Sequence, residues 1–316
     1  MVVRLLQRVG IFLVSIVVSS IIVFAFMAVL PGDPARVALG VNASDAAVEQ
    51  MRERFGLDRS LVVQYFDWMT GLVTFDPGTS YVSRAPIGPQ IADRLQVTLW
   101  LVVTAMVIAL VIAVPAGTIM AMRHRKLSGL MLSAVSQVGV AVPAFLAGIL
   151  LITVFAVGLG WLPANGWTPP VEDPVMFLKQ LALPALSLGL VQGAVLTRYV
   201  RSAVLDVLRE DYLRTARAKG LRPGQSLMRH GLRNAAVPVV TVLALQLATL
   251  LIGAVVVERV FVIPGLGSLL LDSVSNRDPI MVQDVVMILV IAVLFVNFVV
   301  DLLYTLIDPR LRTGHS

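Results

Sequence analysis

The side chains that carry most enzyme and metal chemistry are scarce in this sequence and are not grouped. The chain has no cysteine, which excludes disulfides and thiolate chemistry. Its histidines, His124, His230 and His315, are far apart and share no spacing typical of metal ligands. We therefore expect no catalytic residue, no cofactor site and no metal site in this chain.

The sequence does contain one strongly basic segment, and its pattern predicts a protruding helical hairpin. The stretch 211–234 reads DYLRTARAKGLRPGQSLMRHGLRN. Apolar residues before and within the start of this stretch follow helical spacing: Leu205, Leu208, Tyr212 and Ala216. Gly220 predicts the end of that helix, because glycine readily adopts the left-handed backbone of a helix C-cap. Pro223 suits the first turn of a second short helix, roughly 223–229.

The elements that must position this hairpin are membrane spans. The 316 residues are 58% hydrophobic, with a mean hydropathy of +0.88 and only 14% charged residues. Such a composition is typical of membrane proteins. Since a span needs about 20 apolar residues, the sequence predicts an all-α polytopic membrane protein with six transmembrane helices: 9–30, 96–122, 129–157, 181–200, 235–257 and 285–307.

The spans contain residues that shape helices and allow close packing. Prolines that would kink a helix fall in four of them: Pro115, Pro143, Pro184 and Pro238. Small residues recur at four-residue spacing, which favours close helix packing: Ala109, Ala113 and Gly117, and again Gly189 and Gly193. The spans lack the central carboxylates and histidines of an ion-coupled transporter. Energy for any uphill transport is therefore expected to come from another protein.

The distribution of positive charge predicts the orientation. Two Lys or Arg residues precede the first span, three lie in 123–126, nine in 198–233 and two near the C-terminus, which leaves nine of the 25 for the other side. The positive-inside rule then places both termini and the hairpin in the cytoplasm. Because topology accounts for these charges, nucleic acid is a poor partner. Leucines among the charges favour a cytosolic protein instead.

The long loop between the first two spans is predicted to be extracytoplasmic and partly helical. Apolar residues follow helical spacing there: Phe55, Leu57, Leu61, Tyr65, Trp68 and Leu72. Two interpretations remain open, namely helices lying on the membrane surface and a docking surface for an external partner.

At this level of detail the sequence resembles a known family. DYLRTARAKGL and RHGLRNA resemble the cytoplasmic loop of inner-membrane permease subunits of ABC importers, in particular the dipeptide, oligopeptide and nickel permease family. Further segments are similar to the same family: LPGDPA, GLDRSLVVQY, FVIPGLGSLLLDSVSNRD and VDLLYTLIDPRLR. The general importer pattern is Glu-Ala-Ala, three residues, Gly, nine residues, then Ile-x-Leu-Pro. Only Ala216, Gly220 and Leu232 match it, and these departures are typical of the peptide and nickel branch. One segment departs from the family: at 74–80 this chain has TFDPGTS, where relatives usually have a Gly-Asp-Leu-Gly-like run before a serine.

The resemblance implies a type I ABC importer permease fold and a set of partners. These are a homologous permease forming a heterodimer, two cytosolic ATPase subunits that bind ATP and Mg, an extracytoplasmic substrate-binding protein, a peptide substrate and the lipid bilayer. The implied location is the bacterial inner membrane. None of Lys126, Lys179 and Lys219 stands in a G-x-x-x-x-G-K-[ST] loop, so this chain would not hydrolyse ATP and would not be an enzyme.

The hairpin would be the coupling element of such an importer. Its expected ATPase-docking residues are consecutive: Arg214, Thr215, Ala216, Arg217, Ala218, Lys219, Gly220 and Leu221. The turn IPGLG, with Pro264, Gly265 and Gly267, would belong to an external gate. The expected organisation is a stub and first helix (1–30), an extracytoplasmic loop domain (31–95), a five-helix core (96–307) that includes the hairpin 201–234, and a cytoplasmic tail (308–316).

Three alternatives remain open at this point. The chain could be a stand-alone secondary transporter or channel, although its spans lack ion-coupling groups. It could also be a membrane scaffold that recruits a cytosolic protein without transport. Within the importer class, the substrate could be nickel, haem or glutathione in place of a di- or oligopeptide.

Overall fold

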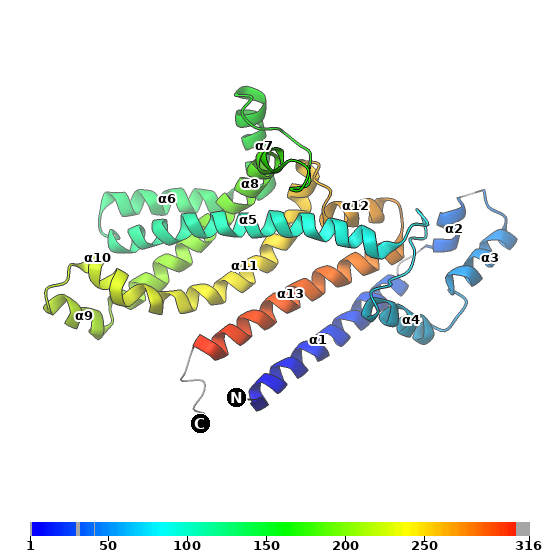
Figure 1. The fold of residues 1–316 in the computed structure, drawn as a ribbon, viewed down its shortest axis with the longest axis horizontal. Helices are drawn as coiled ribbons and strands as arrows, with labels where there is room; N and C mark the ends of the chain where they lie inside the picture. Colours follow the sequence, from blue (N-terminus) through cyan, green and yellow to red (C-terminus); the bar gives the residue numbers. More distant parts are fainter. Residues whose placement is uncertain (1, 30–31, 41, 308–316) are drawn as a thin grey trace. The chain divides into compact units, whose positions relative to one another are not determined.

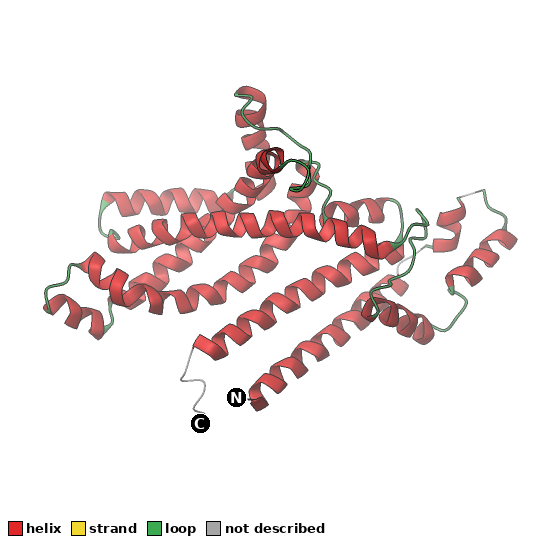
Figure 2. Cartoon of the chain, viewed as in Figure 1, coloured by secondary structure: helices red, strands yellow, loops and turns green. Residues whose placement is uncertain are grey.

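Every regular element in the described residues, 2–29, 32–40 and 42–307, is a helix in this computed structural model (Figure 2). The expected tail 308–316, with Arg310, Arg312 and His315, lies outside the described residues. Figure 1 labels the α-helices α1 (Val2–Val29), α2 (Pro34–Leu39), α3 (Asp45–Phe55), α4 (Leu61–Val73), α5 (Ile87–Met122), α6 (Leu127–Ala141), α7 (Ala144–Leu151), α8 (Pro174–Leu208), α9 (Asp211–Ala218), α10 (Pro223–Ser226), α11 (Leu232–Val260), α12 (Leu266–Ser275) and α13 (Pro279–Ile307). Two π-helical segments are η1 (Ile152–Gly158) and η2 (Leu227–Gly231).

Among the described residues, five helices are long and apolar enough to cross a bilayer: α1, α5, α8, α11 and α13. The pair formed by α6 and by α7 with η1 can provide a sixth span. The predicted all-α class with six spans is therefore confirmed if this bent pair counts as one span. The helices exceed the predicted apolar stretches; α8, for example, contains the whole of the predicted 181–200 and extends beyond both ends.

The third predicted span, 129–157, is broken. Its two halves meet at an angle of 100°. Val142, at the junction, is extended with φ −85° and ψ 122°, because the ring of a following proline disfavours helical backbone at the preceding residue. Pro143 is the N-cap of α7. Pro115, Pro184 and Pro238 lie inside continuous helices, so the break requires more than a proline.

The chain divides into two compact units. The first comprises residues 1–98 and 264–298, and the second comprises 99–263 and 299–316. In the first unit, one cluster of buried apolar residues joins the start of α5 to α12 and α13: Ile87, Ile91, Leu266, Leu269, Met281 and Val285. A smaller cluster joins α2 to α3: Ala35, Val48 and Met51. These clusters hold the loop helices in a defined arrangement within their unit.

The loop after α1 forms three helices, which confirms its predicted helical character. The side chain of Ser44 accepts a hydrogen bond from the backbone N–H of Ala47 (3.3 Å) at the start of α3. Ser60 caps α4 in the same way, 3.5 Å from the nitrogen of Val63. Gly56, with φ 67°, ends α3 and separates it from α4.

In the second unit, α8 packs against α6, α7 and α11 and lies close to α5. A Cβ atom on Gly189 would be 2.7 Å from Cγ2 of Ile108, and one on Gly117 would be 2.7 Å from the carbonyl oxygen of Thr197. Small residues therefore allow the backbones of α5 and α8 to approach closely, as their spacing predicted.

Candidate functional sites: the basic hairpin and the loop domain

The basic hairpin, residues 201–234, contains one break that the sequence pattern did not predict. The pattern indicated a single helix up to Gly220, but α8 ends at Leu208 and α9 begins at Asp211. Between them Glu210 is extended, with φ −64° and ψ 141°. Its N–H donates to the carbonyl oxygen of Val207 at 3.1 Å. No glycine or proline marks this turn, and the apolar spacing continues across it, so the break could not be predicted from the apolar pattern.

The end of α9 at Gly220 has the backbone arrangement of a Schellman motif. Gly220 has φ 94°, a left-handed conformation that favours glycine. Its N–H donates to the carbonyl oxygen of Arg217 (2.9 Å), and the N–H of Leu221 donates to that of Ala216 (3.3 Å). The predicted helix stop at Gly220 is confirmed. A Cβ at this position would contact nothing within 4 Å, so backbone conformation alone accounts for the glycine.

One buried leucine holds α9 against the rest of the hairpin. Leu213 is fully buried, as is Leu227 at the start of η2. A Cβ atom on Gly231 would lie 2.7 Å from Leu227, 3.1 Å from Val207 and 3.4 Å from Leu213. The absence of a side chain at Gly231 thus lets the apolar side of α9 reach the end of α8. The leucines of the hairpin were expected to favour contact with a protein partner, but Leu213 packs inside the hairpin instead.

The opposite side of α9 is open to solvent. Among the eight predicted docking residues, Ala216 and Leu221 are half-buried and the other six are exposed: Arg214, Thr215, Arg217, Ala218, Lys219 and Gly220. Arg214 forms an exposed ion pair with Asp211 at 3.2 Å. The guanidinium of Arg217 donates to the carbonyl oxygens of Leu213 (3.2 Å) and Leu208 (3.4 Å). Arg217 therefore ties α9 to the end of α8.

The three residues predicted for an external gate lie at the beginning of α12, in the first unit. Gly265 is the N-cap of α12, with extended backbone at φ −97° and ψ −176°. Both Gly265 and Gly267 are buried, and Pro264 is half-buried. The N–H of Leu266 donates to the hydroxyl of Thr98 at 2.8 Å, so this turn is fixed to the start of α5.

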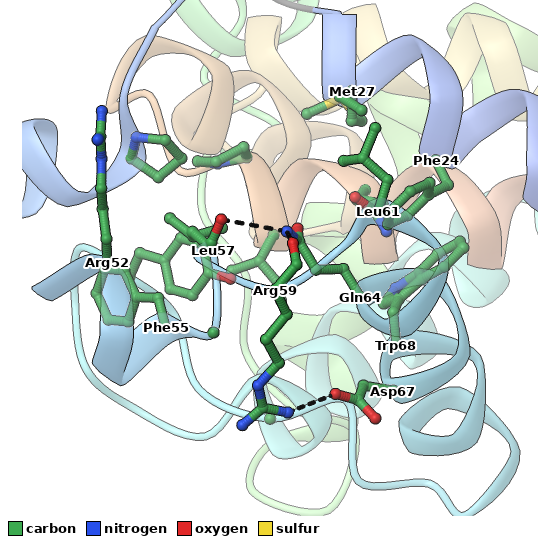
Figure 3. A pocket seen from close by; sticks show the side chains of 18 of the residues that line it. Phe24, Met27, Arg52, Phe55, Leu57, Arg59, Leu61, Gln64, Asp67 and Trp68 are labelled. Atoms are coloured by element: carbon green, nitrogen blue, oxygen red, sulfur yellow. Dashed lines mark hydrogen bonds and ion pairs between the residues drawn. The ribbon is translucent and has the colours of Figure 1, made fainter.

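A cavity of about 610 Å³ in the first unit is lined mainly by the loop domain and also by residues of α1 and α13 (Figure 3). Figure 3 shows Trp68 and Phe24 on one side of it and Arg52 on the other. Most of its charges are paired within the chain. Arg59 forms an ion pair with Asp67 at 2.8 Å, and Arg52 pairs with Asp33 at 3.0 Å. The hydrogen bond to Asp33 raises the pKa of Arg52, so the guanidinium remains charged.

A second feature that could not be predicted from charge or hydropathy lies inside the spans. The side-chain amide of Gln192, on α8, donates to the amide oxygen of Gln246, on α11. Gln192 is buried. Amides that pair across helices carry no charge, so a pattern based on ionisable groups in the spans does not reveal them. Among the described residues, no three His, Cys, Asp or Glu side chains are grouped as metal ligands.

The fold is that of a helical membrane protein with a broken third span and an exposed basic hairpin, and sequence comparison identifies its class. Residues 113–313 match the family described as "Binding-protein-dependent transport system inner membrane component", and residues 1–102 match its N-terminal family. The chain belongs to this family and is a non-catalytic permease subunit of an ABC importer, of the peptide and nickel permease group. It is a multi-pass inner-membrane protein of bacterial type.

Similar proteins of named function support this assignment. The chain is 41% identical over 301 residues to the glutathione transport system permease protein GsiC of Escherichia coli strain K12, and equally to that of Shigella dysenteriae serotype 1. Each alignment covers 94% of this chain and 95% of the relative. A chain of the inward-facing MetNI methionine ABC transporter is similar in fold, with a TM-score of 0.56 and 18% identity, over 69% of this chain and 96% of that one.

Proposed function

We propose that this subunit imports small peptides or peptide-like compounds, with glutathione among the candidate substrates. In this proposal it forms the pathway with a homologous, non-identical permease. Two cytosolic ATPases bind ATP and Mg, and an extracytoplasmic binding protein delivers the substrate. The name of the GsiC relatives supports glutathione, and the resemblance to the wider family supports di- and oligopeptides. Nickel and haem are the alternatives within the same class.

The hairpin is the proposed site of force transfer, with Arg214 to Leu221 docking into the ATPase. The observation that carries this proposal is the mounting of α9. Leu213 of α9 is fully buried. The guanidinium of Arg217 donates a hydrogen bond to the end of α8, and Gly220 ends the last turn of α9. A helix held in these three ways moves with α8. Movement of a partner bound to its exposed side would therefore be transmitted to a membrane span as a rigid-body displacement.

The proposed orientation places the hairpin and both termini in the cytoplasm and the loop domain outside. The excess of Lys and Arg in 198–233 supports it. In the same arrangement Pro264, Gly265 and Gly267 would lie at an external gate. The hydrogen bond from Leu266 to Thr98 (2.8 Å) is compatible with a gate element that moves together with the start of α5.

Cysteine cross-linking tests the docking and the orientation directly. Because the natural chain has no cysteine, Thr215→Cys introduces a unique thiol on the exposed side of α9. In the assembled importer, with single cysteines placed around the groove of the ATPase, we expect a disulfide between the two subunits. The matched control is Val171→Cys, which is 94% exposed in the loop between η1 and α8. It should form no such cross-link and should react with an impermeant maleimide from outside.

The alternatives give different results in this experiment. If Val171→Cys cross-links to the ATPase and Thr215→Cys reacts from outside, the orientation is reversed. If the ATPase binds the chain but Thr215→Cys does not cross-link at any groove position, docking occurs elsewhere and the coupling proposal fails. Uptake driven by a proton gradient with this subunit alone would indicate a secondary transporter.

A further inference from the structure

A second cavity lies between α6 and α8, within the second unit, and its lining is polar. Its volume is about 620 Å³. Only Val195 and Leu205 contribute apolar side chains. The other lining residues carry hydroxyl, amide or guanidinium groups: Ser133, Gln137, Arg198, Tyr199, Arg201 and Ser202. The cavity therefore offers several hydrogen-bond donors and two positive charges in one place.

The walls of this cavity are fixed by contacts between the two helices. The hydroxyl of Ser136 donates to the carbonyl oxygen of Ala194 at 2.8 Å. One turn further along α6, a Cβ atom on Gly139 would lie 2.8 Å from Cβ of Ala194. This close contact lies beside Val195, the first lining residue on α8. The cavity thus begins beside this contact, and its lining residues from Val195 to Leu205 follow about 15 Å of α8 at 1.5 Å per residue.

The two arginines of the cavity have no internal counter-charge. Arg198 and Arg201 are three residues apart on α8 and so lie on the same side of the helix. Within the described part of the chain, neither forms an ion pair, and no carboxylate lines the cavity. The nearest acid along α8 is Asp206, outside the lining. The cavity is therefore a site of uncompensated positive charge.

The position of this charge points to an aqueous pathway. Arg198 lies at the end of the apolar stretch 181–200 that predicted the span, Arg201 lies just beyond it, and Gln137 lies within the predicted span 129–157 on the apolar helix α6. An amide side chain within a span faces a water-filled cavity or the interior of a bundle, because hydrocarbon cannot solvate it, and arginines at the end of a span extend into water. Arginine also suits recognition of planar oxoanions, since its guanidinium can donate two parallel hydrogen bonds to one carboxylate.

We propose that the α6/α8 cavity binds an oxoanion, namely a carboxylate of the transported substrate, through Arg198 and Arg201. This inference rests on the proposed function and narrows it to substrates that carry free carboxylates. Tyr199, Ser133 and Gln137 complete the site with neutral hydrogen-bonding groups. The phosphate of an anionic lipid headgroup has the same chemistry, and the test below separates the two sources.

The test measures binding to the complex of this chain with its partner permease and ATPases, without the binding protein, in nanodiscs of neutral phosphatidylcholine. The probes are glutathione and alanylalanine, each compared with its carboxyl-esterified form. We expect both free acids to raise the unfolding midpoint by about 2 °C or more and the esters to have no effect. Arg198→Gln together with Arg201→Gln should weaken the apparent affinity for the acids at least about tenfold.

Two further variants keep the test decisive. Arg125→Gln removes a charge from the exposed loop between α5 and α6, outside the cavity, and should respond like the wild type. Arg198→Lys keeps the charge but loses the bidentate geometry, and it should weaken binding less than Arg198→Gln. If the double variant does not assemble, comparing the affinities of the single variants Arg198→Lys and Arg198→Gln still tests the site.

Three results would overturn the proposal. The first is an equal response to acids and esters, or no response to either. The second is unchanged affinity in the arginine variants. The third is stabilisation by added phosphatidylglycerol, lost in the arginine variants, with no response to the free acids, which would assign the site to a lipid headgroup. None of these results affects the Thr215→Cys cross-link, so failure here is distinct from failure of the coupling proposal.

Discussion

The indole Nε1 of Trp68 donates a 2.7 Å hydrogen bond to Oδ1 of Asp284, across 216 residues of sequence. The bond joins α4 of the loop domain to α13 within the first unit. Asp284 is fully buried and Trp68 is 7% exposed. Among the described residues, Oδ2 of Asp284 has no hydrogen-bond partner. Trp68 is therefore important in satisfying a buried carboxylate.

Trp68→Phe should destabilise the protein by about 1–3 kcal/mol, because it keeps most of the apolar contact but removes the donor. The unfolding midpoint of the reconstituted chain measures the effect. Trp161→Phe is the control, since Trp161 is 67% exposed and should tolerate the change. Asp284→Asn in the Trp68→Phe background should recover part of the loss by replacing the buried carboxyl group with a neutral amide. Equal midpoints for Trp68→Phe and Trp161→Phe would contradict this role.

Tyr81, in the loop before α5, lies close to Asp284 and to a second acid, Asp278. Its ring stacks on Phe55, with centroids 4.0 Å apart. Burial raises the pKa of Tyr81 from 10.0 to about 12, and the negative charges of Asp278 and Asp284 add to the effect. Between these values the unfolded chain loses the phenol proton while the folded chain retains it. The contribution to stability is therefore complete below about pH 10 and is lost as the pH rises through 12.

Tyr81→Phe should remove this dependence while keeping the ring stacked on Phe55. Unfolding midpoints measured at a series of alkaline pH values should decline less steeply for the variant than for the wild type. Ultraviolet titration of phenolate in both proteins should show that Tyr81, which the variant lacks, ionises at the alkaline end of the titration curve. If the difference between wild type and variant titrates at pH 10, the phenol of Tyr81 is solvated and the burial argument is wrong.

Two glycines one turn apart on α8 should respond differently to the same substitution. A Cβ on Gly189 would lie 2.7 Å from Ile108 and 3.0 Å from the carbonyl oxygen of Ala105, whereas one on Gly193 would meet Ala109 at 3.4 Å. Gly189→Ala should cost about 1–3 kcal/mol of stability by forcing α5 away from α8. Gly193→Ala should be nearly neutral. Thermal unfolding of both variants decides the matter, and equal midpoints would show that the helices do not pack as closely as described.

The spans, the hairpin turn and the loop helices could be predicted because their signals are local. A run of about 20 apolar residues predicts a span wherever it occurs, and Gly220 followed by Pro223 predicts a stop and a new start. The angle at Pro143 could not be predicted in the same way. Pro184 has a similar sequence context and lies in an unbroken helix, so tertiary packing decides which proline breaks its span.

Contacts between distant segments were outside the reach of sequence patterns. Trp68 belonged to an apolar helical pattern, and nothing in that pattern indicated a carboxylate on α13 as its partner. Gln192 and Gln246 carry no charge and were not considered, although the structure pairs them. Arg198 was counted with the topological charges, and only the fold places it in a cavity with Gln137. In each case the missing information is which helix faces which.

Gly220 provides the sharpest test of the hairpin as a coupling element. Proline cannot adopt its φ of 94° and lacks the N–H that donates to Arg217. Alanine can adopt a left-handed backbone at a cost of about 1–2 kcal/mol. Gly220→Pro should therefore abolish both ATPase activity coupled to the binding protein and substrate uptake in proteoliposomes, and Gly220→Ala should reduce both in part.

Gly224→Ala is the matched control within the same hairpin. Gly224 has no positive φ, and a Cβ there would meet only the flexible tip of Met122, at 3.3 Å. This variant should couple normally because it leaves the end of α9 unchanged. A membrane scaffold predicts another pattern, in which Gly220→Pro weakens ATPase recruitment without affecting uptake. Loss of uptake with an intact complex would instead locate the defect in the transfer of movement from α9 to α8, because the partners would still be bound.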